Sequence, residues 1–174
     1  MDGRQYPAKY IGKGHFSKVF RVGDRVVYYT RGDCAKEVLA MFQYDRMAHL
    51  PEIIRHDNIN SRRGTEWYVF SSPFYRNVTT KDSSAYRIMK NLISLTRQFN
   101  SEIFDSNIKG LERMRAFEVY VRGSVPHSIS KALQEIIDVS SNCGDNIGFD
   151  FHKKNFGVNT YGTLIFRDPV YVRD

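Results

Sequence analysis

The sequence predicts an α+β protein in which an antiparallel, β-rich N-terminal part precedes a helical C-terminal part. Residues 8–72 contain short β-prone runs separated by glycine and polar turns, which favours hairpins. Near Ser83 the spacing of apolar residues changes from a period of two to a helical period. A chain of 174 residues fits one domain, and the change of pattern divides it into lobes at about residues 1–72 and 73–174.

Two glycine turns organise the first strands. The first turn contains Gly12 and Gly14, and the second is Gly23-Asp24. A helix is expected from Cys34 to His49, where apolar side chains recur on one face. The β-prone runs around these elements are residues 10–11, 17–20, 25–30, 53–54 and 67–70.

The C-terminal part carries two clear helical patterns. Apolar residues at helical spacing predict helices over Ser83–Phe99 and Ser128–Val139. Residues 103–121 show no equally clear period, so the pattern alone does not assign their structure. Helix-breaking residues up to Gly148 then lead the chain into the segment around Asp150.

The charge of the chain restricts its partners. A formal net charge of +7 favours contact with polyanions such as nucleotide phosphates, nucleic acid or an acidic protein surface. Because the basic residues are scattered rather than striped, direct binding of nucleic acid is not expected.

The cysteines and the apolar runs indicate a cellular location. Cys34 and Cys143 fit neither a metal-ligand spacing nor a disulfide framework, so a reducing cytoplasm is expected. The first residues contain no secretory apolar segment, and no apolar run has the length of a membrane span. The expected location is therefore cytoplasmic, with no membrane partner.

Two acids and one amide near the C-terminus form the pattern that carries chemistry. Asn155 follows Asp150 by five residues (155 − 150), and Asp168 follows Asn155 by thirteen (168 − 155). In a phosphoryl-transfer site the first acid orients the attacking hydroxyl, and the amide and the second acid hold magnesium. The apolar run 163–166 follows Tyr161-Gly162, which predicts a turn and a strand leading to Asp168. The alternative is structural: two loop acids and a capping amide.

The Gly12–Gly14 turn is a candidate phosphate contact. Two glycines separated by one residue let backbone amides approach a phosphate without interference from a Cβ atom. Lys13, Ser17 and Lys18 belong to the same hairpin and are grouped with it as candidate nucleotide contacts. A glycine hairpin of this kind is also common as a purely structural element.

These motifs, in this order, resemble the protein-kinase-like fold. In detail, Ile11–Ser17, Gly148–His152, Asn155 and Asp168–Val170 are similar to the matching parts of the early Ser/Thr protein kinases of T-seven-like bacteriophages. The resemblance implies a two-lobed minimal kinase-like domain that binds ATP and Mg²⁺. It implies that Asp150 is the catalytic-loop acid and that Asn155 and Asp168 are the metal ligands.

The resemblance also assigns roles to the glycines and to one histidine. It implies that Gly12 and Gly14 cover the phosphates of the nucleotide. His152, two residues after Asp150, is similar to a variant found in the aminoglycoside and choline kinases. We expect this histidine to hold the loop by a hydrogen bond.

Three departures from the kinase pattern stand against full catalytic competence. The third strand of a kinase presents a lysine to the phosphates, whereas Tyr28 holds the matching place here. Ser17 replaces the third glycine of the loop, and only six residues (174 − 168) follow Asp168. A displaced cation that compensates would come from Lys13, Lys18 or Lys36.

Two functions therefore remain open. The first is a phage-type Ser/Thr kinase that transfers the γ-phosphoryl group of ATP to host proteins during host takeover. The second is a pseudokinase that binds a host protein and inhibits or redirects it. The spacing of Asp150, Asn155 and Asp168 favours the first function, and Tyr28 favours the second.

Overall fold

The computed structural model describes residues 7–13, 17–31, 37, 40, 47–61, 64–103, 107–144 and 146–172. Its contacts divide the chain into two compact units. The first unit comprises Met1–Tyr44 and Glu52–Phe74, and the second comprises Asp45–Pro51 and Tyr75–Asp174. Most of the predicted Cys34–His49 helix lies outside the described residues, and so does Gly14.

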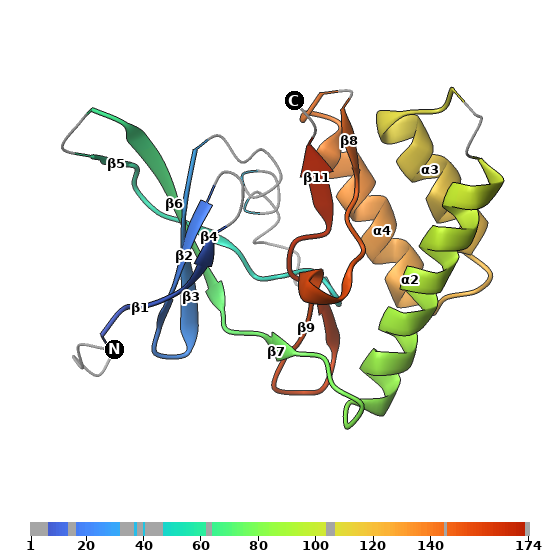
Figure 1. Cartoon of the computed structure of the whole chain (residues 1–174), viewed down its shortest axis with the longest axis horizontal. Helices are drawn as coiled ribbons and strands as arrows, with labels where there is room; N and C mark the ends of the chain where they lie inside the picture. The colour runs from blue at the N-terminus through green and yellow to red at the C-terminus, as the bar shows by residue number, and fades with distance from the viewer. Residues whose placement is uncertain are drawn as a thin grey trace. The chain divides into compact units, whose positions relative to one another are not determined.

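The first unit is built on an antiparallel sheet in the order β1-β2-β3-β6-β4, with β5 also paired to β6 (Figure 1). Gly23, with a φ of 61°, makes the tight turn between β2 and β3, as the sequence predicts. The strands are β1 (Lys9–Lys13), β2 (Ser17–Val22), β3 (Arg25–Thr30), β4 (Ile54–Arg55), β5 (Ile59–Asn60) and β6 (Glu66–Pro73).

One face of this sheet carries the core of the first unit. Phe70 is fully buried there, together with Ala40 and Ile53. The partly buried rings of Tyr28 and Tyr68 pack against this cluster. Because side chains alternate along a strand, Tyr28 and Tyr29 point to opposite faces of the sheet.

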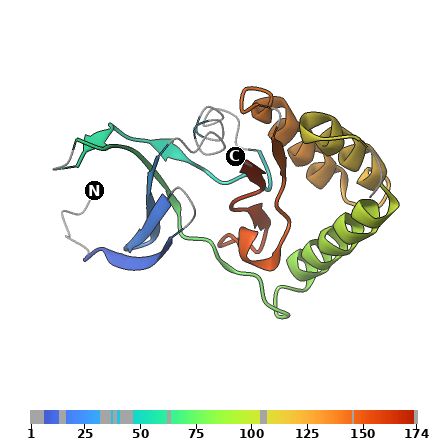
Figure 2. The ribbon, with the colours of Figure 1, turned by 45° about the horizontal axis from the view of Figure 1, so that its top comes forward.

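Three helices form one part of the second unit, and Figures 1 and 2 show them on the same side of its strands. They are α2 (Ser83–Glu102), α3 (Gly110–Val121) and α4 (His127–Ser140). Leu92 of α2, Met114 of α3 and Leu133 of α4 are at most 1% exposed, as expected for amphipathic helices that bury one stripe. The predicted helices over Ser83–Phe99 and Ser128–Val139 are confirmed, and α3 occupies most of the segment that the pattern did not assign.

The strands of the second unit form two small antiparallel groups. β8 (Ile147–Phe149) pairs with β11 (Val170–Val172), and β9 (Phe156–Val158) pairs with both β7 (Arg76–Asn77) and β10 (Leu164–Phe166). The turn before β10 has Gly162 at a φ of 80°, and the Asn159 side chain accepts backbone hydrogen bonds within it. The turn and strand predicted before Asp168 are therefore confirmed.

His49 fastens its segment to the helical unit. Its backbone carbonyl accepts a hydrogen bond from the Phe166 amide, and its Nδ1 lies 2.8 Å from the Leu164 carbonyl oxygen. Its Nε2 lies 3.0 Å from Ser128 Oγ. The ring is 7% exposed, so burial lowers the pKa of His49, and the hydrogen bond to Leu164 only partly opposes this effect.

Two further observations concern membrane spans and the cysteines. Within the described residues, no helix is long and apolar enough to cross a membrane. Cys143 is disulfide-bonded, which corrects the expectation that the cysteines form no disulfide.

Candidate phosphotransfer site in the second unit

The β8–β11 ladder brings two of the predicted site residues to the same end of the strand pair. Phe149 pairs with Val170 at the end of the ladder. Asp150, which follows Phe149, and Pro169, which precedes Val170, therefore lie just beyond this end. There the Asp150 amide donates a 2.8 Å hydrogen bond to the Pro169 carbonyl. Since Asp168 directly precedes Pro169, the two acids enter the site from neighbouring backbone segments.

Asn155 joins them through a short 3₁₀ turn, Lys153–Asn155. Its side-chain Nδ2 donates a 2.9 Å hydrogen bond to the backbone carbonyl of Asp150. With the nitrogen used as a donor, the amide oxygen Oδ1 is the atom with which Asn155 would bind a cation. Hydrogen bonds therefore link the backbone at Asp150 to Asn155 and to Pro169, the residue after Asp168, within one unit. A shared metal and phosphate site for the three side chains stays a prediction.

His152 stabilises this turn, in agreement with the expectation. Its Nδ1 accepts a 3.2 Å hydrogen bond from the Lys154 amide, and its own amide donates to the Asp150 carbonyl. In the neutral tautomer that this geometry assigns, the proton is on Nε2, which lies 3.7 Å from Asp150 Oδ2. The ring thus has a loop-holding role, and its outer nitrogen faces the acid.

A cluster of phenylalanines supports the loop from the interior. Phe149 and Phe151, on either side of Asp150, stack at 4.8 Å with an interplanar angle of 19°. Phe151 also lies 5.8 Å from Phe156, the residue after Asn155, and 5.7 Å from Phe166. Asp150, Asn155 and Asp168 are therefore each within two positions of a buried phenylalanine ring, which restrains their backbone.

Arg167 is a site-supporting residue that the sequence analysis missed. Its amide donates to the Asn155 carbonyl, and its guanidinium donates to the Lys154 carbonyl at 2.6 Å. The same guanidinium donates to the Tyr75 carbonyl and to Asn77 Oδ1. Arg167 directly precedes Asp168, so these bonds connect the Asp168 segment to the Asn155 turn and to β7.

Gly157 makes this close packing around Arg167 possible. A Cβ atom on Gly157 would lie 2.7 Å from the Tyr75 Cβ and 2.9 Å from the Arg167 Cδ. Both separations are below any ordinary van der Waals contact, so only glycine fits without movement of its neighbours.

The donor set suits a hard cation held jointly with phosphate oxygens. Among the described residues, no group of three or more His, Cys, Asp or Glu side chains could hold a metal alone. The Asp168 carboxylate and the Asn155 amide oxygen are the oxygen ligands that Mg²⁺ prefers, and Mg²⁺ usually takes few protein ligands beside phosphates. The Asp150 side chain is 38% exposed, which leaves it accessible to an acceptor hydroxyl.

The residues predicted in the first unit divide between the two faces of its sheet. Lys18 pairs with Tyr29, whereas Val19 pairs with Tyr28, so Lys18 and Tyr28 point to opposite faces. The Lys18 ammonium lies 5.4 Å from the centre of the Trp67 ring instead. The structure therefore does not bring Lys18 to the Tyr28 position as a replacement cation.

The other predicted residues of that hairpin are placed only in part. Gly12 and Lys13 lie in β1 and Ser17 begins β2, while Gly14 is outside the described residues. A Cβ atom on Gly12 would meet nothing within 4 Å. Packing in the described part of the chain therefore does not explain a glycine here, and its contact with phosphate stays a prediction.

Comparisons with known proteins give structural likeness only. No family model matches the sequence, and no curated protein matches it. Similar solved structures include aminoglycoside phosphotransferases, which have a protein-kinase-like fold. A GDP complex of an aminoglycoside 2'-phosphotransferase-IIIa mutant is 12% identical with a TM-score of 0.39, over 99% of this chain and 67% of that one.

A second similar structure is aminoglycoside phosphotransferase APH(4)-Ia in a ternary complex with AMP-PNP and hygromycin B. It is 12% identical with a TM-score of 0.42, and the match covers 99% of this chain and 70% of that one.

Proposed function

We propose that this chain is a magnesium-dependent phosphotransferase that moves the γ-phosphoryl group of ATP to a hydroxyl acceptor. The observation that supports the proposal is a pair of hydrogen bonds, one from Asp150 to Pro169, the residue after Asp168, and one from Asn155 to Asp150. A catalytic-loop acid followed by an amide and a second acid is the arrangement that phosphoryl transfer uses.

Each residue has a distinct role in the proposed reaction. The Asp150 carboxylate accepts the proton of the attacking hydroxyl as a new bond forms between that oxygen and the γ-phosphorus. The bond from the γ-phosphorus to the bridging oxygen breaks, and ADP leaves. Asn155 and Asp168 would hold Mg²⁺, which neutralises charge on the phosphates.

The proposed acceptor is a Ser or Thr side chain of a host protein. Its support is the resemblance to the phage kinases at Ile11–Ser17, Gly148–His152, Asn155 and Asp168–Val170. A contact-only protein, which binds a host factor without transfer, is the second candidate. It is favoured by Tyr28, which occupies the expected lysine position and packs its ring against the Phe70 cluster.

Two isosteric substitutions separate these candidates. Asp150→Asn removes the proton acceptor and should abolish transfer from radiolabelled ATP, while stabilisation of the fold by ATP with Mg²⁺ remains. Asp168→Asn removes a metal ligand and should reduce that stabilisation itself. Transfer is measured with and without Mg²⁺, including autophosphorylation, and stabilisation is measured as the shift in melting temperature.

Growth of a bacterial host that expresses each variant supplies the biological readout. If the growth inhibition by the wild type disappears in Asp150→Asn while ATP stabilisation is retained, phosphoryl transfer is the cause of the inhibition. Inhibition that persists in both variants, with no transfer by the wild type, would show that the protein acts by contact.

A further inference from the structure

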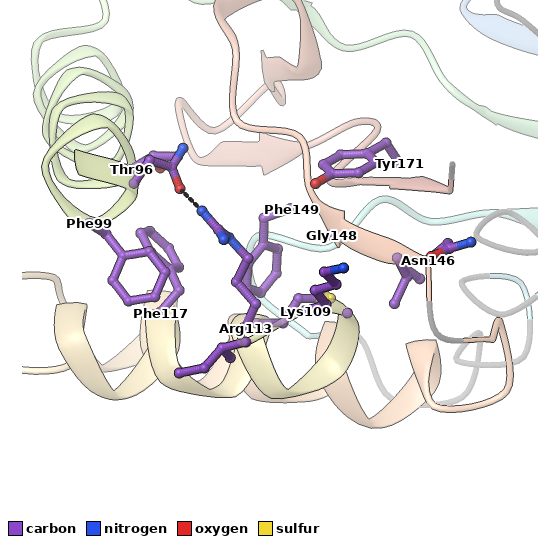
Figure 3. A pocket seen from close by; sticks show the side chains of 14 residues that line it. Thr96, Phe99, Lys109, Arg113, Phe117, Asn146, Gly148, Phe149 and Tyr171 are labelled. Atoms are coloured by element: carbon purple, nitrogen blue, oxygen red, sulfur yellow. Dashed lines mark hydrogen bonds between the residues drawn. The ribbon is translucent and has the colours of Figure 1, made fainter. Parts of the chain in front are cut away.

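A pocket of about 500 Å³ lies in the second unit, between the end of α2, the first half of α3 and the strands β8 and β11 (Figure 3). Its volume is in the range of sites that hold small organic molecules. Phe149, directly before Asp150, forms part of its wall. The pocket therefore lies beside β8, the strand that leads into the Asp150 loop.

The apolar wall of the pocket is aromatic. Phe99 and Phe117 lie 5.3 Å apart in an edge-to-face arrangement, and Phe117 lies 5.7 Å from Phe149. Figure 3 shows these three rings with the Arg113 side chain among them. Phe99 and Phe117 are 4% and 3% exposed and Phe149 is half-buried, so buried rings back an aromatic wall that can accommodate a flat apolar body.

The charged side chains of the pocket are all positive. Of the 14 described residues that line it, Lys109 and Arg113 are the charged ones, and none is Asp or Glu. Arg113 donates a 3.0 Å hydrogen bond to Asn100 Oδ1, and its guanidinium carbon lies 6.0 Å from the centre of the Phe99 ring. These contacts hold the guanidinium at the aromatic wall, and Asn100 takes one of its five N–H donors.

The backbone adds to the positive potential. Helix α3 begins at Gly110, and its N-cap residue Lys109 makes no side-chain cap. The partial positive charge of the helix N-terminus therefore adds to the two cationic side chains at the pocket. The first turn of α3 also contains one acid, Glu112, which is exposed and does not line the pocket, so the pocket itself favours an anionic ligand.

We propose that this pocket binds a small molecule that carries an anionic group on an aromatic body. The anion pairs with Arg113 and Lys109, and the aromatic body lies against Phe99, Phe117 and Phe149. The anion is a carboxylate or a phosphate, since both accept paired hydrogen bonds from a guanidinium. This assignment is independent of the proposed phosphotransfer at Asp150.

The test uses the full chain labelled with ¹⁵N and three matched probes: 2-naphthoate, 2-naphthyl phosphate and the neutral 2-naphthamide. We expect at least one of the two anions to shift the amide resonances of Lys109–Arg113 and of Gly148 and Phe149. We expect the amide probe to bind at least about tenfold more weakly than that anion, because it lacks the charge-assisted hydrogen bond.

Substitutions then identify the charged contact. Arg113→Gln should weaken binding of the preferred anion by about ten- to hundredfold. Lys109→Gln, at an exposed position, should weaken it less and covers the case in which Arg113→Gln alters the fold. Arg115→Gln is the matched control, because Arg115 is exposed on the same helix and does not line the pocket.

Three outcomes would overturn the assignment. The first is equal affinity for naphthamide and the anions, and the second is shifts that map away from the pocket or are absent for both anions at millimolar concentration. The third is wild-type affinity in both Arg113→Gln and Lys109→Gln.

Discussion

The guanidinium of Arg167 donates a 2.6 Å hydrogen bond to the backbone carbonyl of Lys154, thirteen residues earlier in the chain. Further donors of the same group bond to the Tyr75 carbonyl and to Asn77. One side chain therefore bonds to two other segments of the chain, residues 75–77 and the Asn155 turn. Its planar fork suits this role, which a lysine could not reproduce.

Arg167→Gln should destabilise the protein and disturb the site together. Loss of several charge-assisted hydrogen bonds predicts a decrease of about 1–3 kcal/mol in the free energy of unfolding. Urea unfolding measures this decrease, with Arg115→Gln as a control that removes the same charge from an exposed position. The free energy of unfolding of Arg167→Lys should lie between the values of Arg167→Gln and the wild type. Equal urea midpoints for Arg167→Gln and the wild type would contradict the role.

Gly12→Ala should leave the stability of the protein almost unchanged but reduce its stabilisation by ATP with Mg²⁺. A Cβ atom at Gly12 meets nothing within 4 Å in the described structure, so a loss of more than about 0.5 kcal/mol is not expected. A phosphate that approaches the backbone would meet that Cβ atom. The melting-temperature shift on adding nucleotide is the measurement.

Gly123→Ala is the matched control for that experiment, because a Cβ atom there also meets nothing within 4 Å. It should preserve both the stability and the nucleotide shift. A nucleotide shift that Gly12→Ala leaves intact would remove Gly12 from the set of phosphate contacts.

The fold and the site differ in how far local sequence predicts them. The hairpin at Gly23 and the turn at Gly162 follow from residues a few positions apart, because glycine adopts a positive φ that other residues avoid. The Asp150–Asn155 spacing is equally local. Arg167 could not be recognised in this way, since its bond to Asn77 spans 90 positions and depends on the tertiary fold.

The pattern of helix α3 is hard to read for a related reason. Glu118 lies on its buried face at 3% exposure, where a helical pattern would have an apolar residue. The fold compensates with hydrogen bonds from Arg122 and Ser130, and the bond from Arg122 chiefly lowers the pKa of Glu118. Arg122 is four residues away on the same helix, whereas Ser130 belongs to α4, so only part of what makes this buried acid acceptable is visible in the local pattern.

Tyr28 can be tested by two substitutions with different expected effects. Tyr28→Phe removes the hydroxyl that lies 3.1 Å from Ser72 Oγ and should cost about 0.5–1.5 kcal/mol of unfolding free energy. Tyr28→Lys also loses ring packing against the Phe70 cluster, so its unliganded stability should be lower still. If Tyr28 occupies the position of the kinase lysine, Tyr28→Lys should nevertheless gain nucleotide affinity. Unchanged or weaker affinity would show that the position does not face the phosphates.

His49 should make the stability of the protein depend on pH in the weakly acidic range. Burial lowers the folded-state pKa of His49 below its ordinary value of about 6.5. Between the two pKa values the unfolded chain binds more protons than the folded one, so stability rises with pH there. The contribution of His49 is therefore complete above about pH 6.5 and is lost as the pH falls toward the folded-state pKa.

The substitution His49→Asn tests this contribution and allows the backbone conformation at position 49 to be kept. His49 has a φ of 77°, a left-handed conformation that asparagine also tolerates. Asparagine does not titrate in this range and is too short to reproduce both ring contacts, with Leu164 and with Ser128. The variant should be about 1–3 kcal/mol less stable at pH 7.5, and the difference from wild type should shrink as the pH is lowered through 6.5.

The control is His127→Asn, at an exposed histidine near the start of α4. Urea unfolding at intervals between pH 5 and pH 8 should give the same pH slope for this variant and the wild type. A difference between His49→Asn and wild type that stays constant over the whole range would mean that the His49 ring stabilises the fold only by packing and hydrogen bonding. A difference that grows on acidification would reverse the sign of the predicted pKa shift, because only a folded-state pKa raised above 6.5 adds stability as the ring becomes protonated.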